Sequence, residues 1–366
     1  MRGIKDNQKG VFMYVPVEKR IPDDHPIRRI KAVADRVLKR LSPVFDEMYS
    51  KVGRPSIPPE ALLKSQILIA LYSVRSERQF CERLRYDMLF SWFLDMKVDD
   101  DGFDATTFTK NRERLMEQDV ARLFFDEVLE EARKGELLSE EHFTVDGTLI
   151  EAWASMKSFK KKEADGKDED DKGDDDPGNP SVDFHGEKRS NATHRSTTDP
   201  EARLARKGPG KEAKLCFDAH VMMENRSGLC MDVIVTEADG YAEREAAIAM
   251  LDDGKVRTGK YPKTLGADKG YHTKDFIADL RERCIRPHVA VCENRKTPGL
   301  DGRTIRSEGY KASQKIRKRV EEIFGWGKTV GGLKKTRFKG VDLTQQLALF
   351  VGSAYNMLRM ARLVPV

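Results

Sequence analysis

The sequence has 366 residues, 39% hydrophobic and 35% charged, with a net charge of +5, which is enough for two or three domains with hydrophobic cores. Its charged start and the lack of any run of about 18 apolar residues argue against a secretory signal and a membrane-spanning helix, so we expect no membrane partner. Five widely spaced cysteines without a CxxC pair are typical of the reducing cytoplasm and argue against a structural zinc site.

Residues 25–135 have the apolar spacing of a helical domain. Apolar residues recur there every three to four positions, which is the periodicity of amphipathic helices. Residues 1–24 are mixed in composition and contain prolines, so we expect them to form an N-terminal arm.

After Gly135 the pattern changes to short β-rich segments. Three of these come early and the later ones alternate with helices, which indicates a mixed α/β domain over residues 136–342. An apolar helix at 343–366 is expected to pack back on the core. The predicted fold class is therefore α+β multi-domain, with an all-helical domain before the mixed α/β domain. The expected strands are 142–152, 215–224, 229–238, 263–268 and 286–292, and the expected helices between and after them are 241–252, 273–284 and 309–328.

The segment between the first two strands, residues 156–212, contains few apolar side chains. We expect this insertion to be mostly disordered, because it cannot bury enough apolar surface to offset the entropy of ordering. Its part 163–176 has a net charge of −7, which leaves +12 on the rest of the chain. A basic body favours a polyanion such as nucleic acid as partner, although a solvated charged surface has the same composition.

Three acidic residues stand at unusual positions. Asp146 interrupts an apolar strand, where a carboxylate facing a core without a partner would cost several kcal/mol. Asp268 ends a short apolar strand, and Glu321 lies at the edge of the apolar stripe of a helix. Such acids can converge at one edge of a sheet, and oxygen donors are the ligands that Mg²⁺ prefers. Two ions about 4 Å apart can activate water and stabilise the leaving oxygen in phosphodiester cleavage.

Basic residues around Glu321 strengthen this hypothesis. Residues 302–340 contain twelve Lys or Arg and three acids. Arg317 and Lys328 lie four residues before and seven after Glu321, so all three fall near one helical face. Such a face suits a site that binds a phosphodiester backbone, whereas a solvated helix usually mixes its charges more evenly. By composition alone, Glu322 is as good a candidate as Glu321.

With these motifs, the sequence resembles the bacterial insertion-sequence transposases of the DDE class, in the IS-four/IS-five superfamily. "VDGTLIEA" (145–152) resembles the segment around the first aspartate of that family, and "GADKGY" (266–271) resembles its second-aspartate motif. "RKRVEEIFGWGK" (317–328) is similar to its glutamate segment.

The family signature around the glutamate is Tyr-x2-Arg-x3-Glu-x6-Lys. Arg317, Glu321 and Lys328 fit this spacing, which selects Glu321 over its neighbour. The tyrosine position falls on Gln314, a departure from the family, and Tyr310 lies one helical turn earlier.

The resemblance implies an RNase H-like catalytic fold, with Asp146 on its first strand and Asp268 after its fourth. It implies that Asp146, Asp268 and Glu321 are catalytic and hold two Mg²⁺ ions, for which Mn²⁺ can substitute. The implied partners are double-stranded DNA, as transposon ends and as target, and a second copy of the chain in a homodimeric DNA complex. The implied location is the bacterial cytoplasm, on the nucleoid when the protein is bound to DNA.

The helical domain is the candidate for recognising transposon ends. Its helices at 76–96 and 104–115 could form a helix-turn-helix-like pair or the surface of an ordinary bundle. His220 is expected to be a packed strand histidine, and Tyr271 and His272 could touch DNA or simply occupy a turn. The expected DNA-binding residues are Lys110, Arg112, Arg114, Arg317, Arg319, Lys328, Lys334, Lys335 and Arg337.

Two other functions remain open from the sequence. A metal-dependent nuclease with the same three acids would cut DNA but would not join pre-cut ends to a target. A DNA-binding regulator derived from a transposase would still bind DNA after substitution of all three acids.

Overall fold

The computed structural model describes residues 16–50, 52–53, 56–97, 100–162, 182–184, 187–208, 210–292 and 297–363. The acidic run at 163–176 lies outside these residues. Within the described part, no helix is long and apolar enough to cross a membrane.

The N-terminal region is helical, as predicted. Pro26 occupies the first turn of α1, where its missing N–H costs no hydrogen bond, and Ser76 caps α3 by accepting from the Gln79 N–H. The elements are η1 (Val17–Arg20), α1 (Pro26–Met48), α2 (Pro59–Leu71), α3 (Glu77–Leu84), α4 (Met88–Phe93), α5 (Thr106–Glu117) and α6 (Val120–Lys134).

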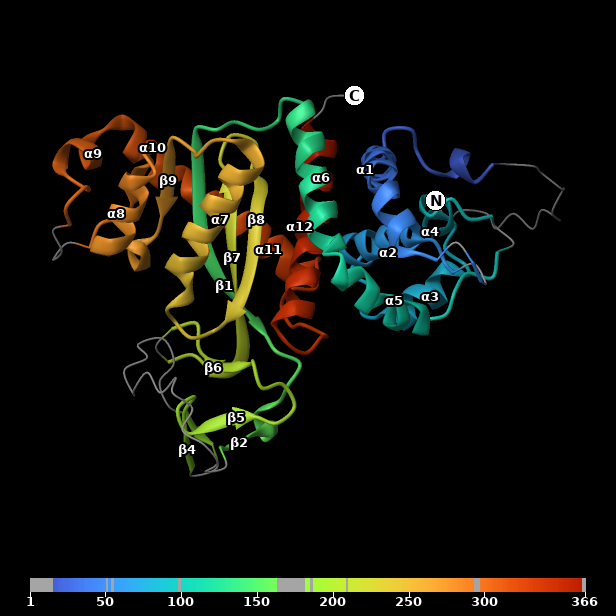
Figure 1. Cartoon of the computed structure of the whole chain (residues 1–366), viewed down its shortest axis with the longest axis horizontal. Helices are drawn as coiled ribbons and strands as arrows, with labels where there is room; N and C mark the ends of the chain where they lie inside the picture. Colours follow the sequence, from blue (N-terminus) through green and yellow to red (C-terminus); the bar gives the residue numbers. More distant parts are fainter. Residues whose placement is uncertain are drawn as a thin grey trace, which may run out of the picture.

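A central sheet follows, with the strand order β10-β9-β1-β7 and with β8 and β6 both paired to β7 (Figure 1). Strand β7 is antiparallel to both β1 and β8, whereas β9 runs parallel to β1 and β10 runs parallel to β9. The five predicted strands are therefore confirmed, and residues 225–228 form the turn between β7 and β8. The strands are β1 (His142–Glu151), β6 (Arg203–Ala205), β7 (Lys214–Glu224), β8 (Leu229–Glu237), β9 (Thr264–Ala267) and β10 (Arg286–Val289).

Helices alternate with the later strands. The predicted helix at 309–328 is present but is divided by the 3-10 turn η4, which carries Arg317 and Arg319. The elements after β8 are α7 (Ala242–Thr258), η3 (Lys269–Tyr271), α8 (Lys274–Glu282), α9 (Gly302–Arg306), α10 (Glu308–Ile316), η4 (Arg317–Arg319), α11 (Val320–Thr329) and α12 (Val341–Leu363).

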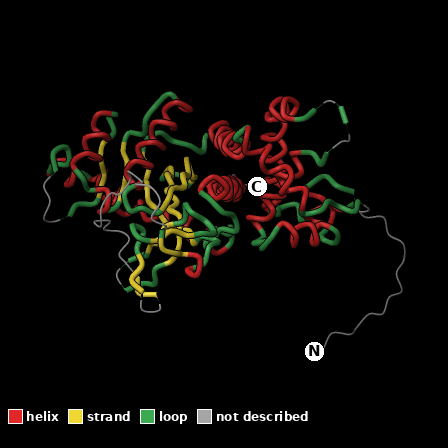
Figure 2. Tube along the Cα trace, turned by 60° about the horizontal axis from the view of Figure 1, so that its bottom comes forward, coloured by secondary structure: helices red, strands yellow, loops and turns green. Residues whose placement is uncertain are grey.

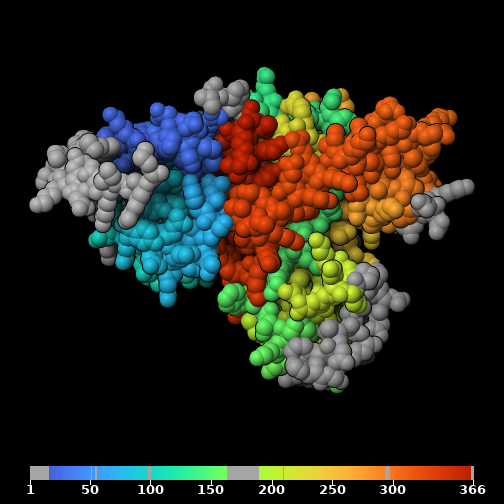
Figure 3. All heavy atoms as spheres, turned by 180° about the vertical axis from the view of Figure 1, so that it is seen from behind, coloured from blue at the N-terminus to red at the C-terminus, as the bar shows by residue number. Residues whose placement is uncertain are grey.

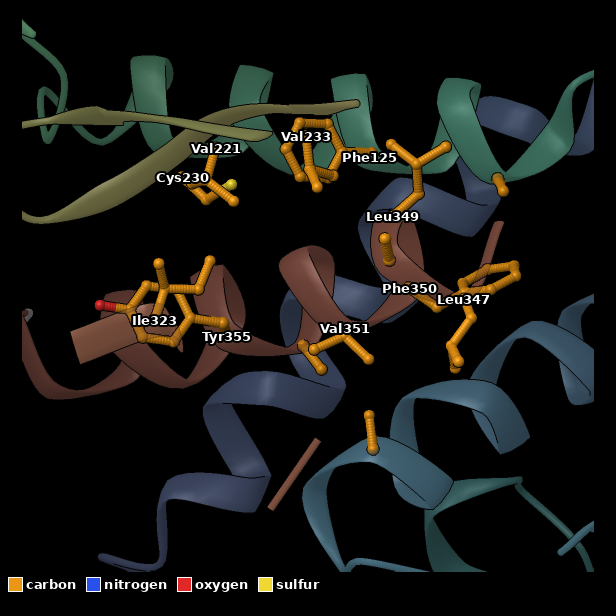
Figure 4. Close-up of a cluster of buried hydrophobic side chains, with 14 of the residues drawn as sticks. Phe125, Val221, Cys230, Val233, Ile323, Leu347, Leu349, Phe350, Val351 and Tyr355 are labelled. Atoms are coloured by element: carbon orange, nitrogen blue, oxygen red, sulfur yellow. The ribbon is translucent and has the colours of Figure 1, made fainter. Parts of the chain in front are cut away.

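Helix α12 lies between the sheet and the N-terminal helices (Figures 1 and 2). In Figure 4, Phe125 of α6 and Val233 of β8 face the apolar side chains of α12. The fully buried Asn356 fixes the helix to β8, because its side-chain amide accepts from the Cys230 N–H and donates to the Cys230 carbonyl, both at 2.8 Å. One continuous hydrophobic core therefore includes residues from the helical region, the sheet and α12.

The expectation of a mostly disordered insertion is wrong for the residues that the structure describes there. Phe159 and His194 are buried against each other, and the Ser158 and Ser196 hydroxyls lie 2.8 Å apart. These buried groups join the 3-10 turn η2 (Met156–Ser158) and strand β2 (Phe159–Lys161) to strand β5 (His194–Ser196). A second short pair is formed by β3 (Val182–Phe184) and β4 (Glu187–Arg189).

Candidate functional site

The register of two parallel strands brings the first two predicted acids together. Thr144 of β1 is paired with Gly266 of β9. Asp146 and Asp268 each lie two residues further along, so they are level with each other at the carboxyl end of β9. The two carboxylates therefore come from adjacent strands although 122 positions of sequence separate them.

One carboxylate oxygen of each aspartate accepts a hydrogen bond from a nearby backbone N–H. Asp146 Oδ1 accepts from the Gly147 N–H at 2.9 Å, and Asp268 Oδ1 accepts from the Gly270 N–H at 2.7 Å. The pKa of Asp146 is raised to about 6, mainly by burial and also by the charges of Asp268 and Glu321, against the opposing effects of the Gly147 N–H and Arg317. The negative charge of Asp146 is thus incompletely compensated by the protein.

Helix α11 carries both candidate glutamates, and the structure distinguishes them. The charge of Glu321 acts on Asp146, as the raised pKa of that carboxyl reflects. Glu322 forms ion pairs with Arg319 at 3.8 Å and with Arg359 of α12 at 3.5 Å. Glu322 therefore joins α11 to α12, whereas Glu321 is exposed, forms no ion pair among the described residues, and is the glutamate whose charge acts on Asp146.

Arg317 is held beside these acids by Gln314. The Arg317 Nε–H donates to Gln314 Oε1 at 3.2 Å, and the Gln314 side-chain amide donates in turn to the carbonyl of His288 on β10. The Tyr310 hydroxyl donates to the Val289 carbonyl at 2.9 Å. Gln314, which departs from the family signature, thus orients the arginine and helps Tyr310 to fix α10 to β10.

The structure adds two acids that the sequence reading missed. Asp218 of β7 is buried, and Glu243 lies in the first turn of α7. Burial, together with the charges of Asp218, Asp268 and Asp146, raises the pKa of Glu243 to about 7. In the sequence, Asp218 is an acid inside an apolar strand, as Asp146 is, whereas Glu243 has only the position of an ordinary acid in the first turn of a helix.

The candidate ligands are oxygen donors, which suit Mg²⁺, but their side chains do not converge on one metal-binding point. In the described ranges, no three His, Cys, Asp or Glu side chains are arranged to hold a metal. All the candidate ligands are carboxylates, and a buried carboxylate repelled by its neighbours is stabilised by a divalent cation.

Several predicted DNA-binding residues have partners within the protein. Arg112 pairs with Glu77 at 2.7 Å and stacks on Phe338 at 4.7 Å. Arg319 donates to the carbonyls of Asn225 and Arg226 at 2.7 and 2.9 Å. These two arginines hold the fold together, and such contacts reduce their availability to DNA.

The remaining candidates differ in exposure. Lys335 is exposed but pairs with Glu151 at 3.1 Å, and Arg337 is largely enclosed, which lowers its pKa. Lys328 donates to the Thr148 hydroxyl on β1 at 2.6 Å. Lys110, Lys334 and Arg114 are exposed, with Arg114 stacked 4.6 Å from the centre of the Tyr49 ring.

The histidines and the tyrosine near the site are packed. His220 is buried and its Nε2 lies 2.9 Å from the Thr236 hydroxyl, as expected of a strand histidine. Tyr271 and His272 are each 1% exposed, so the option that they touch DNA is wrong for this conformation. His272 instead accepts from the Cys292 N–H at 3.0 Å.

Two family models match the chain. One, described as a transposase domain, matches residues 15–114, and the other, described as a transposase DDE domain, matches residues 189–357. Asp268 and Glu321 lie inside the second match, whereas Asp146 lies between the two. No curated protein matches the sequence.

Among solved structures, the chain is similar to a piggyBac transposase synaptic complex with hairpin DNA. The identity is 9%, the TM-score is 0.40, and the match covers 92% of this chain and 75% of that one. It is also similar to a Mos1 transposase paired-end complex, with 12% identity, a TM-score of 0.21 and coverage of 78% and 81%. TM-scores below 0.5 are too low to equate the folds.

Proposed function

Because the chain belongs to the DDE-type transposases, we propose that it binds the inverted-repeat ends of its element and that it cuts and rejoins DNA there. Asp146, Asp268 and Glu321 are the proposed catalytic acids. The observation that carries this assignment is the setting of Asp146, a half-buried carboxyl whose pKa is raised to about 6 by burial and by repulsion from acids on two other elements. Such a setting is typical of a functional acid rather than a surface acid.

The proposed catalytic fold is RNase H-like. In its support, β1 lies in the middle of the sheet and carries Asp146, with antiparallel β7 and β8 on one side and parallel β9 and β10 on the other. Asp268 follows the fourth of these five strands along the chain. The acids therefore lie on rigid elements, which favours precise positioning of the reacting phosphate.

When bound by these carboxylates, two Mg²⁺ ions, or Mn²⁺ in their place, would supply an activated water and stabilisation of the leaving oxygen. The protein's own basic groups complete the proposed site. Arg317, oriented by Gln314 and with its charge acting on Asp146, would bind a phosphate oxygen there. Lys328 extends from α11 to Thr148 on β1 and adds a second positive charge along the same strand.

The proposed partners are double-stranded DNA and a second copy of the chain. Cutting two ends of one element in a single complex requires two catalytic centres, and a homodimer supplies them. We place the active protein in the bacterial cytoplasm, on the nucleoid.

Strand transfer is the activity that separates a transposase from a nuclease with the same acids. Linear DNA with pre-cut transposon ends, a target plasmid and Mg²⁺ should give joined products with the wild-type protein and none with Asp146→Asn. Gel analysis of the plasmid measures the joining. Cutting of intact ends without any joining of pre-cut ends would make the protein a nuclease.

Lys110 and Arg112 provide a test of the DNA-binding surface of α5. Lys110→Ala should weaken binding to all DNA sequences, because the exposed lysine is expected to contact a phosphate and no base. It should also reduce the slope of log affinity against log salt concentration by about 1. Arg112→Ala should instead lower the free energy of unfolding by on the order of 1–2 kcal/mol, through loss of the Glu77 pair. Fluorescence anisotropy and urea denaturation measure the two quantities. A lysine variant with an unchanged salt slope would remove α5 from the interface.

A further inference from the structure

Glu243 reaches the catalytic acids from a helix that the three-acid motif does not include. Helix α7 begins at Ala242, just after β8, and packs against β8, β7 and β1. Glu243 is half-buried, whereas Glu245, two residues further along the helix, is exposed. The first turn of α7 therefore directs one carboxylate to the sheet and another to solvent.

Two glycines show where the Glu243 carboxylate lies. A methyl group on Gly147 would be 3.3 Å from Glu243 Oε1 and 3.5 Å from Asp218 Oδ1. A methyl group on Gly270 would be 3.7 Å from Glu243 Oε2 and 3.0 Å from Asp268 Oδ1. The two oxygens of Glu243 thus extend between the backbone next to Asp146 and the turn after Asp268.

Two buried polar atoms at the same place lack a partner in the described part of the chain. The Tyr271 hydroxyl has no hydrogen bond, and the charges acting on it are those of Glu243, Asp146, Asp218 and Asp268. His220 Nδ1 has none either and lies 3.4 Å from the methyl position on Gly147. Unpaired buried polar atoms are costly and rare, so their presence beside these acids indicates a missing ligand.

Positive charge near Glu243 is scarce. Arg244 is the cation that acts on it, more weakly than the neighbouring acids, and the Arg244 side chain donates to the Gly270 carbonyl at 3.4 Å. A half-buried carboxylate among acids is unfavourable unless a cation or a proton compensates it. Oxygen donors and a phenolic hydroxyl are suited to a hydrated divalent ion, since the hydroxyl can donate to a ligand oxygen.

We propose that Glu243 is a fourth acid of the catalytic centre, which holds a divalent cation together with Asp146 and Asp268 and is oriented by the Tyr271 hydroxyl. This inference rests on the proposed function, because it assigns Glu243 to the same site. The carboxylates must turn from their local amides to close around the ion. Gly147 and Gly270 leave the space in which they do so.

The test compares Glu243→Gln with Glu245→Gln, a matched control on the same helix. Thermal unfolding is measured without DNA, in EDTA and then in Mg²⁺ or Ca²⁺, so that the first readout is binding of the cation alone. The second readout is the Mg²⁺ concentration for half-maximal cutting of transposon ends. Asp146→Asn is included as the reference for the proposed function.

Glu243→Gln should unfold in EDTA at or above the wild-type temperature, because the repulsion is relieved. It should lose at least half of the cation-induced rise in Tm, and it should need roughly tenfold more Mg²⁺ for cutting. Glu243→Asp, which keeps the charge on a shorter side chain, should give values between those of the wild type and Glu243→Gln. Glu245→Gln should match the wild type.

The inference is overturned if Glu243→Gln keeps the full cation-induced rise in Tm and cuts at the wild-type Mg²⁺ concentration, while Asp146→Asn loses the rise in Tm and no longer cuts DNA. If Asp146→Asn also keeps the shift and continues to cut DNA, the proposed catalytic site itself is wrong.

Discussion

Asp146→Asn is expected to reduce DNA cutting by at least about a thousandfold while binding to the transposon ends persists. The amide keeps the shape of the carboxyl but cannot hold a cation, and loss of one metal ligand removes the chemistry that the ion supplies. Asp268→Asn and Glu321→Gln should have the same effect if the three acids form the proposed single site, because the charges of both act on Asp146. Cleavage of end-labelled DNA in Mg²⁺ and a gel-shift assay in EDTA measure the two properties.

Glu322→Gln is the control for this experiment. Glu322 is adjacent to Glu321 but pairs with Arg319 and Arg359, so its substitution should leave cutting within about threefold of the wild type. Loss of cutting in Glu322→Gln with retention in Glu321→Gln would reverse the assignment of the two glutamates. Cutting that survives Asp146→Asn would exclude this carboxyl from the reaction.

Asp232→Ala is expected to give the largest loss of stability, about 3–5 kcal/mol in the free energy of unfolding. Asp232 is 1% exposed and pairs with Arg122 of α6 at 2.7 Å and with Arg257 of α7 at 2.6 Å. Its removal leaves two enclosed guanidinium groups for which, among the described residues, the more distant Asp126 is the remaining ion-pair partner. Urea denaturation measures the change.

Asp253→Ala is the matched control, because Asp253 is an exposed aspartate on α7. Its effect should be within about 0.5 kcal/mol. A loss below about 1 kcal/mol in Asp232→Ala would mean that Asp126 replaces it as the partner of both arginines.

The strands and the first two catalytic candidates could be predicted because their signals are local. Asp146 and Asp268 each stand at or in a short apolar run, and the runs correspond to β1 and β9. The choice of Glu321 over Glu322 needed the family spacing, and the ion pairs of Glu322 supply an independent physical reason. The parallel pairing of β1 with β9 brings Asp146 and Asp268 next to each other, and this pairing cannot be read from either local pattern.

Glu243 could not be predicted, because its burial depends on how α7 lies on the sheet. The stretch "YAEREAA" reads as the charged start of an exposed helix, and Glu245 fits that description. Similarly, Arg112 looked like a DNA-binding residue because its partner Glu77 is 35 positions away in the sequence. Pairings between distant elements are invisible to local patterns.

The low apolar content of residues 156–212 predicts disorder, but composition alone is a poor guide for a segment whose two ends are fixed by the sheet. Its described strands are three residues long and depend on a few buried groups such as Phe159 and Leu204. Strand β6 also extends the main sheet by pairing with β7. An existing sheet edge lowers the number of apolar residues that such a segment needs.

The position of α12 also determines when during synthesis the protein can fold. The orange and red segment that includes α11 and α12 crosses the middle of the molecule between the N-terminal helices and the sheet (Figure 3). Residues 341–363 are made after both of these partners, so the ribosome releases the helical region and the sheet with their shared apolar faces still uncovered. The nascent chain must therefore rely on chaperones or remain partly open until α12 emerges. Helix α11, which carries Glu321, packs against α12, so cutting activity should appear only after α12 has emerged and docked.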